Sequence, residues 1–204
     1  WVYTRCGYLK QNEVQYYLPS QVTLSGSNLV LTAQHTSHTG PSYPSAGGGN
    51  VTQPWISGAV QSNTRTFKPS AGNFMTFEVK QQVMADAGNG FWPGLFWLEG
   101  QAFLDQCKTD PDQPGWDNAT QAEIDVAEWF MTGTPNSYGT NTYGNTEDAF
   151  TANSVVGTSM NVYQAKWKPG VSNTFFLNGT QTHQVTNTGQ VASSSTQFFL
   201  LLYL

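Results

Sequence analysis

Short segments with strand character, separated by turn residues, recur along the whole chain and constrain its fold more than any other feature. No run long enough for a helix shows an apolar period of 3.6 residues, and no internal repeat is present. Short strands at this spacing predict an antiparallel β-sandwich or barrel. Besides a hairpin at residues 22–33, the segments with strand character are residues 57–62, 75–83, 94–98, 122–129, 161–167, 173–177 and 197–203.

Two of the connecting segments are long. Residues 34–50 are polar and rich in glycine, and we expect them to form a loop. The region from Glu99 to Gln121 is an irregular excursion that contains several Asp, Pro and Gly residues. It directly precedes the strand that carries the acids. Loops of this length in compact domains are usually functional or mobile.

The length and charge of the chain narrow the classes of function. Its 204 residues suffice for one sizeable core, so we expect a single domain over residues 1–204. Charged residues make up only 10% and the net charge is −5, which argues against nucleic acid and anionic membrane surfaces as partners. No apolar run is long enough to span a membrane. We expect a monomer that acts on a neutral polymer.

Glycosylation sequons and cysteines indicate whether the protein is secreted. Three N-x-S/T sequons, at Asn50, Asn118 and Asn178, fit a secreted protein, although a chain so rich in Asn and Thr yields sequons by chance. Cys6 and Cys107 allow either one disulfide or two buried thiols. The first residues do not form a signal peptide, so secretion requires that one has been removed. We expect an extracellular protein.

The most unusual segment is residues 123–128, Glu-Ile-Asp-Val-Ala-Glu, which places three carboxyl groups within six residues. In a regular strand the side chains alternate, so Glu123 and Asp125 share one face and Glu128 points to the other. One extra residue, inserted as a β-bulge at Val126-Ala127, would return Glu128 to the face of the other two acids. The sequence therefore predicts a bulge at this position.

Three aligned acids allow three interpretations. Glu123 and Glu128 would flank Asp125 at a separation of about 5–5.5 Å, which a retaining glycosidase needs between its two carboxyl groups. Proton sharing would then keep one Glu protonated as an acid while the other is ionised. The same acids would also suit a Ca²⁺ ion or a solvated strand face.

Tryptophans are candidate platforms for sugars, because the apolar face of a pyranose ring packs on an indole. Trp92 and Trp116 lie in turn-rich contexts, and we predict that they contact a ligand. Trp97, Trp129 and Trp167 lie within apolar strand patterns and are expected in the core. All five predictions follow from sequence context alone.

The histidines indicate no metal site and no hydrolytic triad. His35, His38 and His183 stand in polar segments whose spacing matches no metal-ligand motif. We expect all three on the solvated surface.

Motifs in several parts of the chain occur together, in the same order, in one known family. Residues 123–128 match the pattern E-x-D-x-x-E, and residues 90–98 look like the segment G-x-W-P-A-x-W-L. Residues 161–167 look like a Y-x-x-x-W strand, and residues 12–17 and 26–33 look like N-E-x-Q-Y-Y and G-N-L-V-L-T-A strands. The chain thereby resembles glycoside hydrolase family 16, in its bulged, laminarinase-like branch.

The resemblance implies a fold and a set of roles. The fold would be all-β, a two-sheet antiparallel jelly roll of the concanavalin A type with a concave sugar-binding cleft. By motif position, Glu123 would be the nucleophile, Glu128 the acid/base and Asp125 the residue that holds and tunes them. Trp92 and Trp116 would be the sugar platforms.

The match is not uniform. The family's second Trp aligns with Phe96 or, after one inserted residue, with Trp97, so Trp97 joins the substrate-binding candidates. Where many members carry a His that faces the site, residues 140–143 offer none, and Asn141 is the candidate there. Family members commonly continue beyond both ends of this chain, which implies a domain without its terminal strands.

The resemblance implies a retaining endo-β-glycoside hydrolase that cleaves β-1,3- or mixed β-1,3/1,4-glucan by double displacement. It implies no required cofactor and allows a structural Ca²⁺ ion. The same chemistry on a galactan such as agarose, or transfer to a sugar acceptor, is the alternative among enzymes. A lectin-like binding module is the alternative from another class. Buried, mutually repelling acids argue against that module, because binding alone does not need them.

Overall fold

The computed structural model describes residues 2–3, 14–41, 49–62, 67–83, 93–99, 122–129, 138–143, 147–148 and 159–204, without the side chains of residues 2–3, 95–99, 143, 147–148 and 199. Contacts within the chain group it into two compact units. Unit 1 comprises residues 1–63, 100–117 and 201–204, and unit 2 comprises residues 64–99 and 118–200. The regular secondary structure of the described ranges consists of strands and a one-turn 3-10 helix, η1 (Pro19–Gln21). The described residues contain no helix that is long and apolar enough to cross a membrane.

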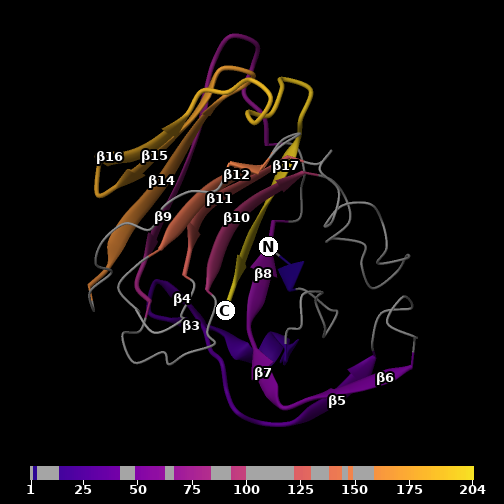
Figure 1. Ribbon diagram of the computed structural model, residues 1–204. Coiled ribbons are helices and arrows are strands. Elements are labelled where there is room, and N and C mark those ends of the chain that lie inside the picture. The colour runs from indigo at the N-terminus through magenta and orange to yellow at the C-terminus, as the bar shows by residue number, and fades with distance from the viewer. Residues whose placement is uncertain are drawn as a thin grey trace. The chain divides into compact units, whose positions relative to one another are not determined.

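Unit 2 contains two antiparallel sheets (Figure 1). One has the order β17-β10-β11-β12-β13 and the other the order β16-β15-β14-β9. The first half of β17 belongs to this unit. The strands are β9 (Met75–Gln81), β10 (Gly94–Glu99), β11 (Glu123–Glu128), β12 (Gly139–Tyr143), β13 (Glu147–Asp148), β14 (Asn161–Lys168), β15 (Ser172–Leu177), β16 (Thr180–Val185) and β17 (Phe198–Tyr203).

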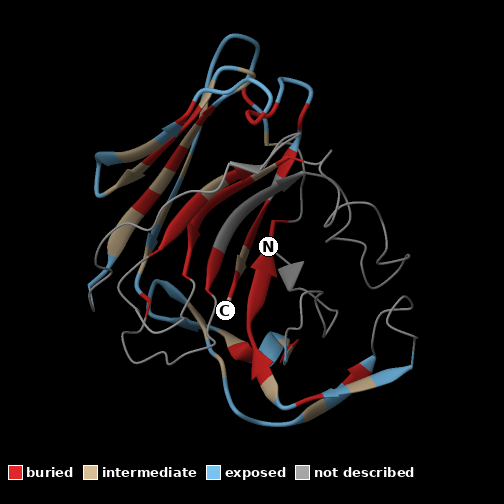
Figure 2. Cartoon of the chain, in the orientation of Figure 1, coloured by how far each residue is buried: buried red, intermediate tan, exposed pale blue. Residues whose placement is uncertain are grey.

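Strand β14 shows why these residues form a sandwich layer. Tyr163, Ala165 and Trp167 are buried and alternate with less buried residues, as Figure 2 shows. This period of two buries one face of the strand and leaves the other to polar side chains. On the outer face, the ammonium group of Lys166 lies 3.7 Å from the centre of the Phe74 ring. The burial of Trp167 confirms its predicted place in the core.

The two sheets of unit 2 pack through the buried faces of β12, β14 and β15. The side-chain amide of Asn173 in β15 donates a hydrogen bond of 3.1 Å to the hydroxyl of Thr142 in β12. Trp129, directly after β11, packs edge-to-face on Tyr163 in β14, with ring centres 5.1 Å apart. Trp129 is fully buried, as predicted. These contacts identify the inner face of the sheet that carries the acids.

Unit 1 consists of short sheets. Strand β8 pairs with β1 and with the end of β17, and β2 pairs with β7 in parallel. The remaining strands form the hairpins β3–β4 and β5–β6. The strands are β1 (Val2–Tyr3), β2 (Gln15–Tyr17), β3 (Val22–Ser25), β4 (Asn28–Leu31), β5 (His38–Pro41), β6 (Asn50–Gln53), β7 (Trp55–Ser57) and β8 (Ala59–Gln61).

The hairpin predicted at residues 22–33 is confirmed. Strands β3 and β4 pair from Val22–Leu31 to Ser25–Asn28. Gly26 in the turn has a φ of 61°, a left-handed conformation that glycine adopts without steric cost.

The loop predicted at residues 34–50 is partly wrong, because residues 38–41 form strand β5. Their sequence, His-Thr-Gly-Pro, has no apolar alternation that would reveal a strand. The strand is held instead by tertiary contacts with Tyr16, which packs against Gly40 so closely that a Cβ there would clash. The Tyr16 hydroxyl also donates to the carbonyl of Pro41 at 3.2 Å.

The histidine predictions need a correction as well. His38 and His183 lie in strands β5 and β16 and are half-buried, whereas His35 is exposed as predicted. The His38 ring lies 4.6 Å from Tyr16, and the His183 ring stacks on Phe175 at 5.9 Å. Because the sequence neighbours of both histidines are polar, no local pattern indicates these ring contacts.

The predicted fold class is confirmed. The described residues are almost entirely in strands, the sheets of unit 2 are antiparallel, and two of them pack face to face. That the chain acts as a single domain stays a prediction.

Candidate active site

A β-bulge interrupts the acidic strand β11. On the β12 side, Asp125 pairs with Asn141 and Glu128 pairs with Gly139, so two residues of β11 stand opposite one residue of β12. On the β10 side, Asp125 and Ala127 pair with adjacent residues, which leaves Val126 without a partner position. The bulge predicted at Val126-Ala127 is therefore confirmed.

The register places all three acids on one face of the sheet. Directly paired residues of neighbouring strands point to the same side, and residues two apart on one strand do so as well. Glu123, Asp125 and Glu128 pair with positions 143, 141 and 139 of β12, which are spaced two apart. Glu128 thus faces the same side as Glu123 and Asp125, whereas regular alternation would point it to the opposite side.

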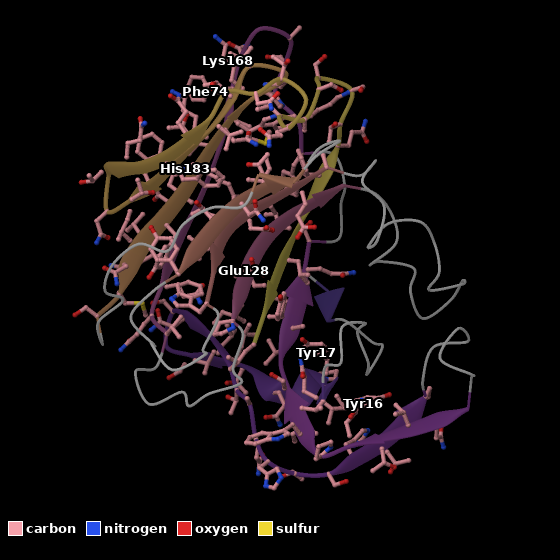
Figure 3. All side chains as sticks on the ribbon, in the orientation of Figure 1. Tyr16, Tyr17, Phe74, Glu128, Lys168 and His183 are labelled. Atoms are coloured by element: carbon pink, nitrogen blue, oxygen red, sulfur yellow. The ribbon has the colours of Figure 1, made fainter. Side chains whose placement is uncertain are left out.

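The acid face points away from the core between the two sheets. Ile124 pairs with Thr142, which contacts the second sheet through Asn173, so these residues form the opposite, inner face. Even so, the acids are shielded from solvent. Asp125 is only 1% exposed and Glu128, labelled in Figure 3, is 8% exposed, while Glu123 is half-buried.

Each acid has a different neighbour across the strands. Asp125 lies beside Asn141, whose side-chain oxygen accepts a hydrogen bond of 2.9 Å from the backbone N–H of Thr142. Glu128 lies between two glycines, Gly94 of β10 and Gly139 of β12. Neither glycine is among the site residues that the sequence predicts. Gly94 occupies the position of Ala in the W-P-A motif of the family that the chain resembles.

Burial and a hydrogen bond act on Glu123 in opposite directions. Removal from water disfavours the charged form and raises the pKa of Glu123 above its ordinary value of 4.5. A side-chain hydrogen bond with Asp125 lowers that pKa and is the smaller effect. This hydrogen bond therefore favours the ionised form of Glu123.

The predicted substrate-binding residues divide into three groups. Asn141 lies on the acid face beside Asp125. Trp97 lies in β10 at the position opposite Ile124, and its side chain is not among those described. Trp92 and Trp116 lie outside the described residues, as do Cys6 and Cys107. The sugar platforms and the concave cleft stay predictions.

In the described ranges, no group of three or more His, Cys, Asp or Glu side chains is arranged to hold a metal ion.

Known structures share the fold. The endo-β-1,3-glucanase from Pyrococcus furiosus matches with a TM-score of 0.70 at 18% identity, over 94% of this chain and 69% of that chain. A LamA variant from Zobellia galactanivorans, in complex with laminaritriose and laminaritetraose, matches with a TM-score of 0.70 at 17% identity, over 99% of this chain and 78% of that chain. The κ-carrageenase from Pseudoalteromonas carrageenovora matches with a TM-score of 0.63 at 13% identity, over 93% and 70%.

The three matches concern the fold rather than the sequence. No protein-family model matches this chain, and no curated protein does either. At 13% to 18% identity, the structural matches show that the chain has the laminarinase type of β-sandwich fold. This agrees with the fold that the motifs implied.

Proposed function

We propose that this protein is a retaining endo-β-glycoside hydrolase that cleaves β-1,3- or mixed β-1,3/1,4-glucan. The observation that carries the proposal is the bulge in β11, which aligns Glu123, Asp125 and Glu128 on one face of the sheet. Two carboxyl groups near one another on one surface are the machinery of double displacement. The shared fold with glucan hydrolases adds support.

In the first step, the Glu123 carboxylate attacks the anomeric carbon and forms a covalent glycosyl ester. The bond from that carbon to the leaving oxygen breaks, and Glu128 gives the oxygen its proton. In the second step, the ionised Glu128 takes a proton from water, which attacks the anomeric carbon and releases Glu123. Asp125 supports the first step through its hydrogen bond to Glu123. Both protons are accounted for by Glu128 and water, so no metal is needed.

A neutral glucan fits the charge of the chain better than a sulfated polymer. Only 8 of the 204 residues are Lys or Arg, whereas sulfate groups are best bound by such cations. Because a κ-carrageenase shares the fold, a sulfated galactan is a suitable comparison substrate.

The proposal is tested by the release of reducing ends from laminarin, lichenan, agarose and κ-carrageenan, with and without EDTA. We expect turnover of laminarin or lichenan, a mixture of oligosaccharides as the product of endo cleavage, and the same rate with EDTA. Turnover of a galactan alone would move the assignment to that polymer. Binding of laminarin without any turnover would favour a lectin-like module.

The role of Asp125 is tested by the pH dependence of kcat/KM. Activity needs ionised Glu123, so it is lost as the pH falls through the pKa of Glu123. In the proposed mechanism Asp125 donates the hydrogen bond that lowers this pKa, and Asp125→Ala removes it. We therefore expect the acid limb of the profile to move to higher pH.

Asp125→Asn is the matched control, because its side-chain N–H can still donate to Glu123. We expect its acid limb to stay closer to that of the wild type. A move of the limb to lower pH in Asp125→Ala would mean that Asp125 carries a negative charge and that the proposed donor role is wrong.

A further inference from the structure

Three aromatic rings form a closed cluster between the sheets of unit 2. Trp129 packs on Tyr163 edge-to-face at 5.1 Å, and Tyr138 packs on Tyr163 in the same way at 5.1 Å. Trp129 and Tyr138 lie 5.9 Å apart. All three side chains are at most 2% exposed. Edge-to-face pairs of aromatic rings stabilise a core beyond the burial of their area.

The cluster is joined to Glu128 through the backbone. Trp129 directly follows Glu128, and its N–H donates a hydrogen bond of 3.0 Å to the carbonyl of Pro93. Tyr138 directly precedes Gly139, which pairs with Glu128 across the strands. Two of the three rings are thus one residue away from Glu128 or from its partner. The third ring, Tyr163, holds both of them from the opposite sheet.

The bulge interrupts the regular pairing of β11 between Asp125 and Glu128. A bulge removes regular ladder hydrogen bonds and increases the local twist of the strand. The strand end that carries Glu128 is therefore less fixed by pairing than the end that carries Glu123. The aromatic cluster packs behind this end of the strand.

We propose that Trp129, Tyr138 and Tyr163 are positioning residues that set the placement of Glu128 as proton donor. None of them shares the face of the acids, because all three rings lie between the two sheets of unit 2. Burial raises the pKa of Tyr138 and Tyr163, so both stay neutral and add no charge behind the site. The inference rests on the proposed hydrolase function and deepens the assignment of Glu128.

The experiment uses the need of the leaving group for a proton. A sugar leaving group needs protonation by Glu128, whereas an activated aryl group such as dinitrophenolate leaves without it. Displacement of Glu128 therefore lowers kcat/KM for laminarin but spares kcat/KM for a dinitrophenyl β-glucan oligosaccharide. A simple loss of folded enzyme lowers both values by the same factor.

Tyr163→Leu removes the shared ring of the cluster. We expect kcat/KM for laminarin to fall by up to about 100-fold, the cost of misplacing a catalytic group by an ångström. For the dinitrophenyl substrate we expect kcat/KM to change less than threefold, which is about the scatter of such assays. Azide should raise kcat on that substrate, because it replaces water in the step that Glu128 assists as a base. Tyr163→Phe keeps the ring and should behave like the wild type.

Two further variants guard against misfolding. Phe198→Leu removes an equally buried ring that packs on Trp167 at 4.8 Å, at the other end of β14. It should lower the melting temperature without changing the ratio of the two kcat/KM values. Trp129→Phe is a milder change in the cluster and carries the same expectation as Tyr163→Leu if the latter does not fold.

Equal losses on both substrates, or no loss on either, would overturn the positioning role while the hydrolase assignment stands. Absence of turnover by the wild-type protein on both substrates is a different result, because it overturns the proposed function itself.

Discussion

Glu123→Gln is expected to lower the hydrolysis of laminarin by about 10³-fold or more, because an amide cannot form the glycosyl ester that double displacement requires. The substitution keeps the size of the side chain and removes only its charge. Binding of laminarin should therefore remain measurable, for example by affinity electrophoresis. The initial rate of reducing-end release measures the loss.

Glu78→Gln is the matched control. Glu78 is exposed on the outer side of β9, where it accepts a hydrogen bond of 2.8 Å from the side chain of Gln164. This variant loses the same charge far from the acid face, and we expect full activity. If Glu123→Gln hydrolysed laminarin as fast as Glu78→Gln, Glu123 could not be the nucleophile.

Glu128→Ala is expected to lower kcat/KM for laminarin by about 10²- to 10⁴-fold, the usual contribution of general acid catalysis. An activated aryl glycoside should still form the glycosyl ester in this variant, because its leaving group needs no proton. Added azide should then release the sugar from Glu123 and restore turnover. The rate of aryl alcohol release, with and without azide, measures this rescue.

The configuration of the azide product assigns the two acids. In Glu128→Ala, azide attacks after Glu123 has inverted the anomeric carbon once, so the product should be the β-glycosyl azide. In Glu123→Ala, azide takes the place of the nucleophile and should give the α-glycosyl azide. The two anomers are distinguished by proton NMR, and the reverse pattern would exchange the two roles.

The sequence predicts the acid face of this protein well because strand geometry is simple. Alternation forces a choice between a misdirected Glu128 and a bulge, and the register of β11 shows the bulge. Long strands such as β14 are equally readable, because apolar residues such as Trp167 recur at every second position. Local pattern and tertiary structure agree in these places.

Other strands are invisible in the sequence because their stability does not come from their own apolar residues. Strand β16, with the sequence Thr-Gln-Thr-His-Gln-Val, has almost no apolar side, and it exists because β15 offers it a pairing edge. Strand β5 depends on the contact of Tyr16 with Gly40, twenty-four residues away in the chain. The aromatic cluster around Tyr163 also joins distant segments, which no local pattern predicts.

The two glycines beside Glu128 lower the stability of the sheet and place no side chain next to this acid. A glycine within a strand costs about 0.5–1 kcal/mol relative to alanine, so Gly94 and Gly139 together cost the sheet about 1–2 kcal/mol. Because glycine has no side chain, neither directly paired position of β10 or β12 puts one beside Glu128. In the proposed mechanism the Glu128 carboxyl group serves the leaving oxygen in one step and a water molecule in the next. A larger residue at either glycine position would add a side chain beside that group.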